Sequence, residues 1–379
     1  MISQLYKHDS RHATWLELFF DLVFVAVIGV VTHDLAHTHD GHIGTEQLLR
    51  FPLVFIPVWW IWMTHTLFSN RFDSDSRYDR MITLAVMGLM VVFSTFAESS
   101  MGEGFVQFAS LYAGVRLILA AQYFYVHHHF RDEVNFAKDM GAIIGAGALV
   151  SLLSVAFDGT LRYLVFYGGI GLDIFLQAIL QKKTLTRPVD RKHLVERIGL
   201  LAIIILGESV IAMVAALSEV EWTKTAILSS VFGFALLGSI WWIYFDSFET
   251  MERSQRLDAP NLLVFSHLFL CMGLLILANL IRHSILGDLD RPTFGLLAIV
   301  GLVFFYLGKQ IPYWYAFPPW RKAIVGNTVI CVSITIASSF MPAIEYSLVG
   351  MTLGMMVYVA LTHLRVLSVD VDDYLDAHA

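Results

Sequence analysis

The sequence predicts an all-α fold, a polytopic transmembrane helical bundle of about twelve spans. Of the 379 residues, 57% are hydrophobic and 15% are charged, whereas a soluble protein usually carries about 25% charged residues. The mean hydropathy is +0.65. The apolar residues form runs of about 20 residues, which is the length of helix that crosses the hydrocarbon core of a bilayer.

Twelve apolar runs separated by short polar linkers define the expected spans. Six lie near residues 13–35, 48–70, 80–98, 104–127, 138–157 and 160–181. Six more lie near residues 194–217, 224–248, 260–283, 292–316, 320–340 and 344–366. The linkers are too short to hold a large soluble domain.

Basic residues in the linkers predict the orientation. Most Lys and Arg residues fall in alternate linkers, such as 71–80 and 182–197, whereas the intervening linkers 33–42 and 98–104 are acidic or histidine-rich. Cytoplasmic loops carry the excess of basic residues in membrane proteins. We therefore expect a multi-pass protein of the cell membrane with both termini in the cytoplasm.

The basic linker at the middle of the chain predicts two six-helix halves, residues 1–185 and 186–379, within one integral membrane unit. A weak internal repeat supports this 6+6 division. The sequence WWIW at 59–62 resembles WWIY at 241–244, and Asp21 aligns with Glu208. An even number of helices in each half would make the repeat parallel.

Polar residues inside the apolar runs are the first candidates for function. Residues 15–25, WLELFFDLVFV, place Glu17 and Asp21 four residues apart on one helical face. Carboxylates inside a membrane are costly, and they often mark substrate or proton pathways. We expect one polar cavity for substrate or protons, and fixed ion pairs between helices are the alternative. The other members of this set are Arg116, Asp173, Glu208, Ser209 and Lys309.

Two further groups are weaker candidates. Polar residues near the inner ends of the spans suggest a gate, although a solvated loop explains them equally well. They are Asn70, Arg71, Asp73, Glu196, Arg197 and Asp246. Trp59, Trp60 and Trp62 could form an aromatic wall for a ligand, but such side chains more often pack against neighbouring helices.

Several function classes are disfavoured. The net charge of −7 argues against nucleic acid as a partner. No phosphate-binding glycine loop, serine-hydrolase motif or zinc-protease motif occurs, which argues against an ATP-driven pump. We expect no cofactor, and an enzyme is the least favoured class. The histidines within 33–42 and 127–129 lack a recognised metal-site pattern, and we expect no metal.

Three segments carry a resemblance to a known family. WLELFFDLVFV, WWIW followed by NRFDSD, and ERIGLLAIIILGESV resemble the bacterial low temperature requirement protein A family. The likeness covers nearly the whole chain. It implies a polytopic bacterial membrane protein associated with growth in the cold, but no defined substrate. The motif positions are Glu17, Asp21, Asn70, Arg71, Asp73, Glu196, Arg197, Glu208 and Ser209.

Three functional hypotheses follow. The leading one is a secondary transporter or permease for a small solute or ion, with proton coupling through the buried acids. A membrane sensor of cold or envelope state, acting through a partner at the basic linker, is the alternative. A membrane-embedded lipid enzyme ranks lowest, because no nucleophile and base are suitably spaced.

Overall fold

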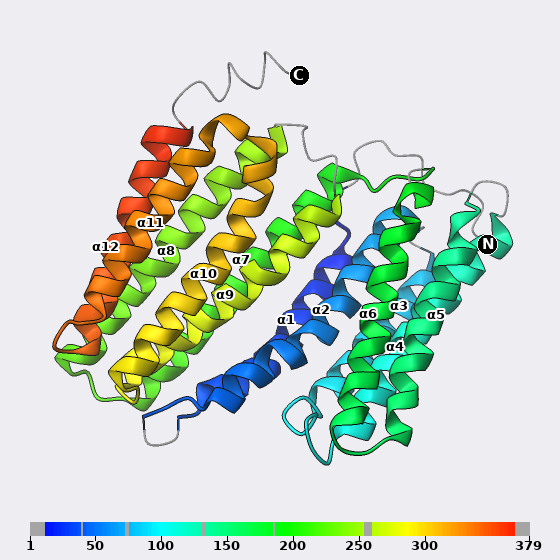
Figure 1. The fold of residues 1–379 in the computed structure, drawn as a ribbon, viewed down its shortest axis with the longest axis horizontal. Coiled ribbons are helices and arrows are strands. Elements are labelled where there is room, and N and C mark those ends of the chain that lie inside the picture. The colour runs from blue at the N-terminus through cyan, green and yellow to red at the C-terminus, as the bar shows by residue number, and fades with distance from the viewer. Residues whose placement is uncertain are drawn as a thin grey trace. The chain divides into compact units, whose positions relative to one another are not determined.

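The computed structural model of the chain describes residues 12–38, 41–72, 76–130, 134–184, 186–253 and 260–367. These ranges form twelve α-helices and no strand (Figure 1). The helices are α1 (Trp15–Thr32), α2 (Thr45–Phe72), α3 (Arg77–Ser94), α4 (Phe105–His129), α5 (Phe136–Leu153), α6 (Gly159–Thr184), α7 (Arg191–Glu219), α8 (Lys224–Arg253), α9 (Pro260–Leu286), α10 (Arg291–Ala316), α11 (Arg321–Ser338) and α12 (Ile344–Thr362). Short helical turns follow α1, α5, α10 and α12.

Each expected span corresponds to one helix of the described chain. Ten helices are long and apolar enough to cross a membrane. The helices α3 and α11 are not among these ten; α3 begins with Arg77 and Arg80 in its first turn, and α11 begins with Arg321 and Lys322. The all-helical, multi-pass membrane fold is therefore confirmed, while twelve spans and a 6+6 repeat stay predictions.

Side-chain caps determine where several helices begin. Ser76 precedes α3, and its hydroxyl accepts a hydrogen bond of 3.2 Å from the backbone N–H of Asp79. Asp290 precedes α10 and accepts a hydrogen bond of 3.0 Å from the N–H of Thr293. Such caps satisfy backbone donors that the first helical turn leaves unpaired.

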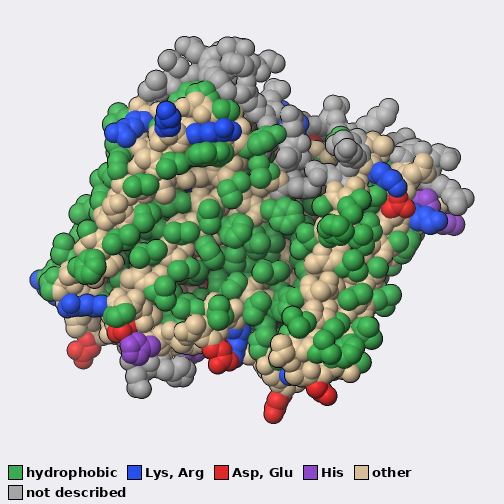
Figure 2. Space-filling view, viewed as in Figure 1, with side chains coloured by type: hydrophobic (Ala, Val, Ile, Leu, Met, Phe, Trp, Pro, Cys, Tyr) green, Lys and Arg blue, Asp and Glu red, His purple; other side chains and the backbone are tan. Residues whose placement is uncertain are grey.

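Large apolar side chains cover the outer faces of the helices. Leu164 and Phe175 on α6 are 65% and 63% exposed. Figure 2 shows hydrophobic side chains along the sides of the helices and most charged ones near the helix ends. Trp15 and Trp222 lie at or just before the first residue of α1 and α8, where aromatic side chains meet the membrane interface. This surface suits lipid rather than water.

The chain divides into two compact units. Unit 1 comprises Met1–Val31 and Arg50–Arg197, and unit 2 comprises Thr32–Leu49 and Ile198–Ala379. The expected division between residues 185 and 186 rests on a repeat in the sequence. The two compact units do not test that repeat. The two Trp pairs that suggested this repeat differ in environment, since Trp59 and Trp60 are buried whereas Trp241 and Trp242 are about half exposed.

In unit 1, α3 packs on α4, α4 on α5 and α5 on α6. The contact of α5 with α6 depends on Gly147, where an added Cβ would lie 2.7 Å from the Cβ of Asp173. Small residues of this kind let helix backbones approach closely in membranes. In unit 2, α9 packs on α10, α11 on α12 and α12 on α8.

Candidate functional site

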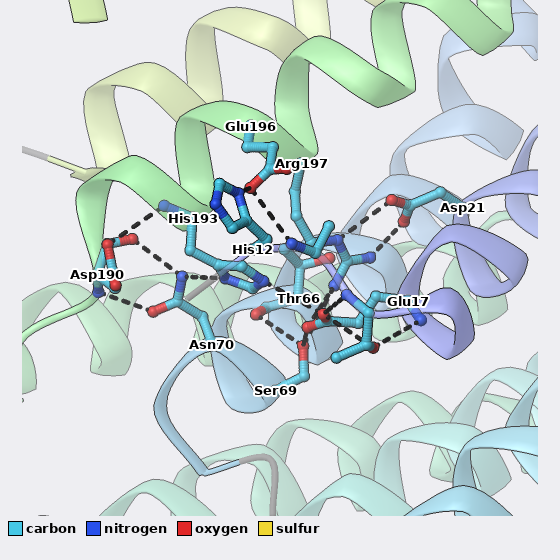
Figure 3. A network of polar contacts seen from close by, with 12 residues as sticks. His12, Glu17, Asp21, Thr66, Ser69, Asn70, Asp190, His193, Glu196 and Arg197 are labelled. Atoms are coloured by element: carbon cyan, nitrogen blue, oxygen red, sulfur yellow. Dashed lines mark hydrogen bonds and ion pairs between the residues drawn. The ribbon is translucent and has the colours of Figure 1, made fainter. Parts of the chain in front are cut away.

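Unit 1 contains a buried polar network that joins α1, α2 and the first turns of α7 (Figure 3). We call it the Arg197 hub. Each of its side chains is less than one tenth exposed. Its members are Glu17, Asp21, Trp62, Ser69, His193 and Arg197.

The strongest contact in the hub is the ion pair between Asp21 and Arg197, both 0% exposed. Nε of Arg197 donates to Oδ2 of Asp21 at 3.1 Å, and Nη2 donates to Oδ1. The indole N–H of Trp62 also donates to Oδ1, at 2.8 Å. Two parallel N–H···O bonds give a guanidinium–carboxylate pair both strength and a fixed geometry.

Glu17 has a local structural role as well as a place in the hub. Thr14 and Glu17 form a reciprocal capping pair at the start of α1. The N–H of Thr14 donates to Oε2 of Glu17 at 2.9 Å, and the N–H of Glu17 donates to the Thr14 hydroxyl at 3.3 Å. Nη1 of Arg197 lies 3.4 Å from Oε1, to which Ser69 donates at 3.1 Å. Glu17 therefore anchors the helix and shares Arg197 with Asp21.

The hydrogen bonds of the Asn70 amide determine which ring nitrogen of His193 carries the hydrogen atom. The backbone N–H of Asp190 donates to Oδ1 of Asn70 at 2.8 Å, so the amide nitrogen Nδ2 faces the Asp190 carbonyl at 3.0 Å and Nδ1 of His193 at 2.8 Å. Nδ1 must therefore accept. The ring hydrogen then sits on Nε2, which donates to Oε2 of Glu17 at 3.2 Å. His193 is thus a neutral imidazole in this arrangement.

Four of the expected gate residues lie in or beside the hub. Arg197 belongs to it, and Asn70 contacts it through His193. Glu196 accepts a hydrogen bond of 3.2 Å from the N–H of Ala13. Nε of Arg71 donates to the carbonyl of Arg187 at 3.2 Å, which ties α2 to the linker before α7. Asp73 lies outside the described residues.

A second buried network in unit 1 joins α2, α4 and α6, and we call it the Arg116 hub. Arg116 and Asp173, each 1% exposed, form an ion pair. The indole N–H of Trp60 donates to Asp173 at 2.7 Å, and the amide of Gln177 donates to it at 2.8 Å. Arg116 also donates to the hydroxyl of Thr64. Both carboxylate oxygens of Asp173 thus accept at least one hydrogen bond.

The three tryptophans of the expected aromatic wall lie on α2 and are all buried. Trp60 and Trp62 supply hydrogen-bond donors to the two buried aspartates. Trp59 packs against the rings of Phe24, Phe55 and Trp62. A ligand-binding role for this wall stays a prediction.

The remaining candidates belong to unit 2. Glu208 is half-buried, and Ser209 donates to the carbonyl of Ile205 in its own helix at 2.9 Å. Lys309 is 7% exposed, with its ammonium 3.4 Å from the hydroxyl of Tyr358. Asp246 lies 3.6 Å from His363. The expectation of one cavity shared by both halves concerns the two units together and stays a prediction.

Reasoning from the sequence missed His193, Ser69 and Thr64 as members of these networks, whereas the spacing of four residues between Asp173 and Gln177 is visible in the sequence. For His193 a signal was present. It precedes Arg197 by four residues, the same spacing that separates Glu17 from Asp21. Two such pairs on neighbouring helices can meet residue by residue. Here Glu17 meets His193 and Asp21 meets Arg197, so α1 runs parallel to the first turns of α7.

The fold and these networks define the class, a multi-pass membrane protein with ion pairs buried between its helices. Residues 12–362 match the bacterial low temperature requirement A protein (LtrA) family, and the chain belongs to that family. It is also similar to an uncharacterized protein of Rhizobium meliloti (strain 1021). The two are 24% identical over 394 residues, which cover 94% of this chain and 91% of the relative.

Proposed function

We propose that this protein is a secondary transporter for a small solute or ion, coupled to protons through the Arg197 hub. The observation that carries the proposal is the pairing of two carboxylates, Glu17 and Asp21, with one guanidinium in a region shielded from water. Buried acids between membrane helices are a feature of proton relays and ion pathways.

Protonation of Asp21 would change the contact of α1 with the first turns of α7, which hold His193 and Arg197. A neutral carboxyl no longer attracts Arg197, which then relies on its contacts with Glu17 at 3.4 Å and Ser69 at 3.2 Å, and a poorly compensated guanidinium in a buried site is destabilising. The helices would then favour another arrangement in which Arg197 finds a new partner. Arg197 is the last residue of unit 1, and α7 continues into unit 2.

The proposal is tested with the full chain reconstituted in liposomes that enclose a pH-sensitive dye. Separate classes of solute are added outside: amino acids, organic acids, sugars, polyamines and inorganic ions. We expect one class to produce proton movement that empty liposomes do not show. If correctly reconstituted protein moves no protons with any class, while a known proton-coupled transporter does so in parallel, the proposal is wrong.

The same proposal includes an orientation with both termini in the cytoplasm of a bacterial cell. Its support is the high content of Lys and Arg in the linkers 71–80 and 182–197. A reporter that is active only in the cytoplasm should be active when fused after residue 379 and inactive when fused within 98–104. The reverse pattern would contradict this orientation.

One observation favours a second candidate, a membrane sensor that acts through a cytoplasmic partner. In both hubs the two carboxylate oxygens of the buried aspartate, Asp173 or Asp21, already accept hydrogen bonds, as those of fixed structural pairs do. A sensor would show no solute-driven proton movement, and it would retain one specific partner through the basic linker 182–197. Neutralising Lys182 and Lys183 should release that partner.

A further inference from the structure

His65 on α2 is a buried histidine whose ring nitrogens both lack a hydrogen-bond partner within the described chain. Its side chain is 5% exposed, and its ring stacks on Phe20 with the centroids 4.2 Å apart. A neutral imidazole has one donor and one acceptor. Leaving both unpaired in a buried site is costly, so these atoms indicate a missing partner.

A third buried atom without a hydrogen-bond partner among the described residues lies beside the same cavity as His65. Oε1 of Gln122 on α4 also has no partner among the described residues, and that side chain is 4% exposed. His65 and Gln122 line one cavity of about 20 Å³. Its other polar lining residues are Glu17, Ser69, Asp79 and Thr83. The cavity therefore extends from Glu17 of the hub to Asp79 in the first turn of α3.

The size and lining of this cavity suit water. A water molecule needs about 10–15 Å³ of such space and two to four polar partners. One water molecule can bond to one ring nitrogen of His65, which offers a donor or an acceptor, and Oε1 of Gln122 offers an acceptor. We propose that this cavity binds an ordered water molecule, held by His65 and Gln122, which passes protons between Asp79 and Glu17.

The water site stands on the unpaired atoms alone, whereas the proton transfer rests on the proposed function. In the transfer the carboxyl of Asp79 gives its proton to the water, and the water gives another proton to the carboxylate of Glu17. One O–H bond breaks and one forms on the water, so it stays neutral. Asp79, which is half-buried, then regains a proton from solvent.

His65 is a positioning residue in this scheme. The charged groups around it are Glu17 from α1, Asp79 from α3 and, through the hub, Arg197 from α7, while α4 contributes the neutral Gln122. None of them forms a hydrogen bond with His65 in the described structure. His65 is therefore available to orient the water rather than to form an ion pair.

The first test is an experimental structure of the full chain at a resolution that shows ordered water. We expect density within hydrogen-bonding distance of a ring nitrogen of His65 and of Oε1 of Gln122. A well-ordered but empty cavity would overturn the proposal, whatever the transport assays give. Density there without transport by the wild type would retain the water site and reject the proposed function.

The second test uses two variants of His65 in proton-flux measurements. His65→Phe keeps an aromatic ring on Phe20 but removes both nitrogens, and His65→Gln keeps a donor and an acceptor. We expect His65→Phe to slow proton flux about tenfold, the effect of one lost hydrogen bond on a rate, and His65→Gln to retain most of it. Equal rates in wild type and His65→Phe would overturn the proton route.

The double variant His65→Phe with Gln122→Leu separates folding from proton transfer. It removes the polar atoms that need the water, so the cavity can stay dry without an unpaired group. We expect it to unfold at a temperature no lower than His65→Phe alone and to conduct protons as slowly. Fast flux in this folded variant would contradict the water-mediated route.

Discussion

Arg197 contacts Asp21 through two nitrogens at once, with Nε at 3.1 Å from Oδ2 and Nη2 on Oδ1. Because both side chains are fully buried, removing one leaves the other with a charge that its remaining partners compensate only in part. We expect Arg197→Met to lower the free energy of unfolding by about 4 kcal/mol. The double variant Arg197→Met with Asp21→Leu should lose clearly less free energy of unfolding than Arg197→Met alone, because the buried carboxylate of Asp21 is then not left without its guanidinium. Unfolding in mixed detergent micelles measures both, and additive losses would contradict a direct pair.

Trp62 and Trp59 provide a matched pair of buried indoles on α2. The N–H of Trp62 donates to Asp21 at 2.8 Å, whereas the N–H of Trp59 has no partner in the described structure. Replacing each by Phe removes a similar apolar area. Trp62→Phe should cost about 2 kcal/mol more than Trp59→Phe, the value of a hydrogen bond to a charged acceptor. Equal shifts in unfolding would show that the indole bond contributes little.

Gly147 allows α5 to lie against Asp173 on α6. An added Cβ would lie 2.7 Å from the Cβ of Asp173 and 3.0 Å from the carbonyl oxygen of Gly169. Gly147→Ala should destabilise unit 1 by about 2 kcal/mol through overpacking. Gly145→Ala is the control, since its Cβ would meet only the Cβ of Ala120 at 3.8 Å. Thermal unfolding should separate the two, and a neutral Gly147→Ala would contradict the close contact.

Asp290 gives a pH-dependent contribution at the start of α10. Partial burial raises the pKa of its carboxyl, but the hydrogen bonds from Thr293 and the nearby His42, at 3.1 Å, outweigh burial and hold that pKa below its ordinary value. Because the pKa of Asp290 is lower in the folded than in the unfolded protein, the ionised carboxylate stabilises the fold at pH values above the ordinary pKa of an aspartate. This stabilisation is lost as the pH falls through the lowered pKa of the folded state.

At neutral pH we therefore expect Asp290→Ala to cost about 1 kcal/mol through loss of the helix cap. The unfolding temperatures of wild type and variant should converge in acid, as the wild-type carboxyl becomes protonated. A difference that persists unchanged in acid would mean that the carboxylate charge is not what stabilises the cap.

The membrane fold could be predicted from the sequence because each of the twelve expected spans is a contiguous apolar run. It also indicated that Glu17 and Asp21 are unusual, since carboxylates inside such a run must be accommodated. It did not give their partners, because Arg197 is 176 residues from Asp21 and only packing brings them together. Arg197 was instead assigned to an inner gate, near the end of its span.

The Thr-x-x-Glu pattern at 14–17 is a case in which the sequence does give the partner. It is a local signal for a helix start, and the structure has Glu17 in that role as well as in the hub. A local motif can thus account for part of a buried charge that looks functional. For His65 the sequence shows a polar residue inside an apolar run and nothing more, because its unpaired nitrogens are visible only once α1, α3 and α4 surround it.

The most direct test of the account compares Asp21→Asn with Asp139→Asn in liposomes under a pH gradient, with the solute class that drives wild-type flux. Asp139 is an exposed acid paired with Lys183 on the surface and serves as the control. Both variants are first checked for folding by gel filtration and thermal unfolding. We predict that Asp21→Asn abolishes proton-coupled flux and Asp139→Asn leaves it unchanged. Wild-type flux in folded Asp21→Asn would contradict the assignment of the Arg197 hub as the coupling site.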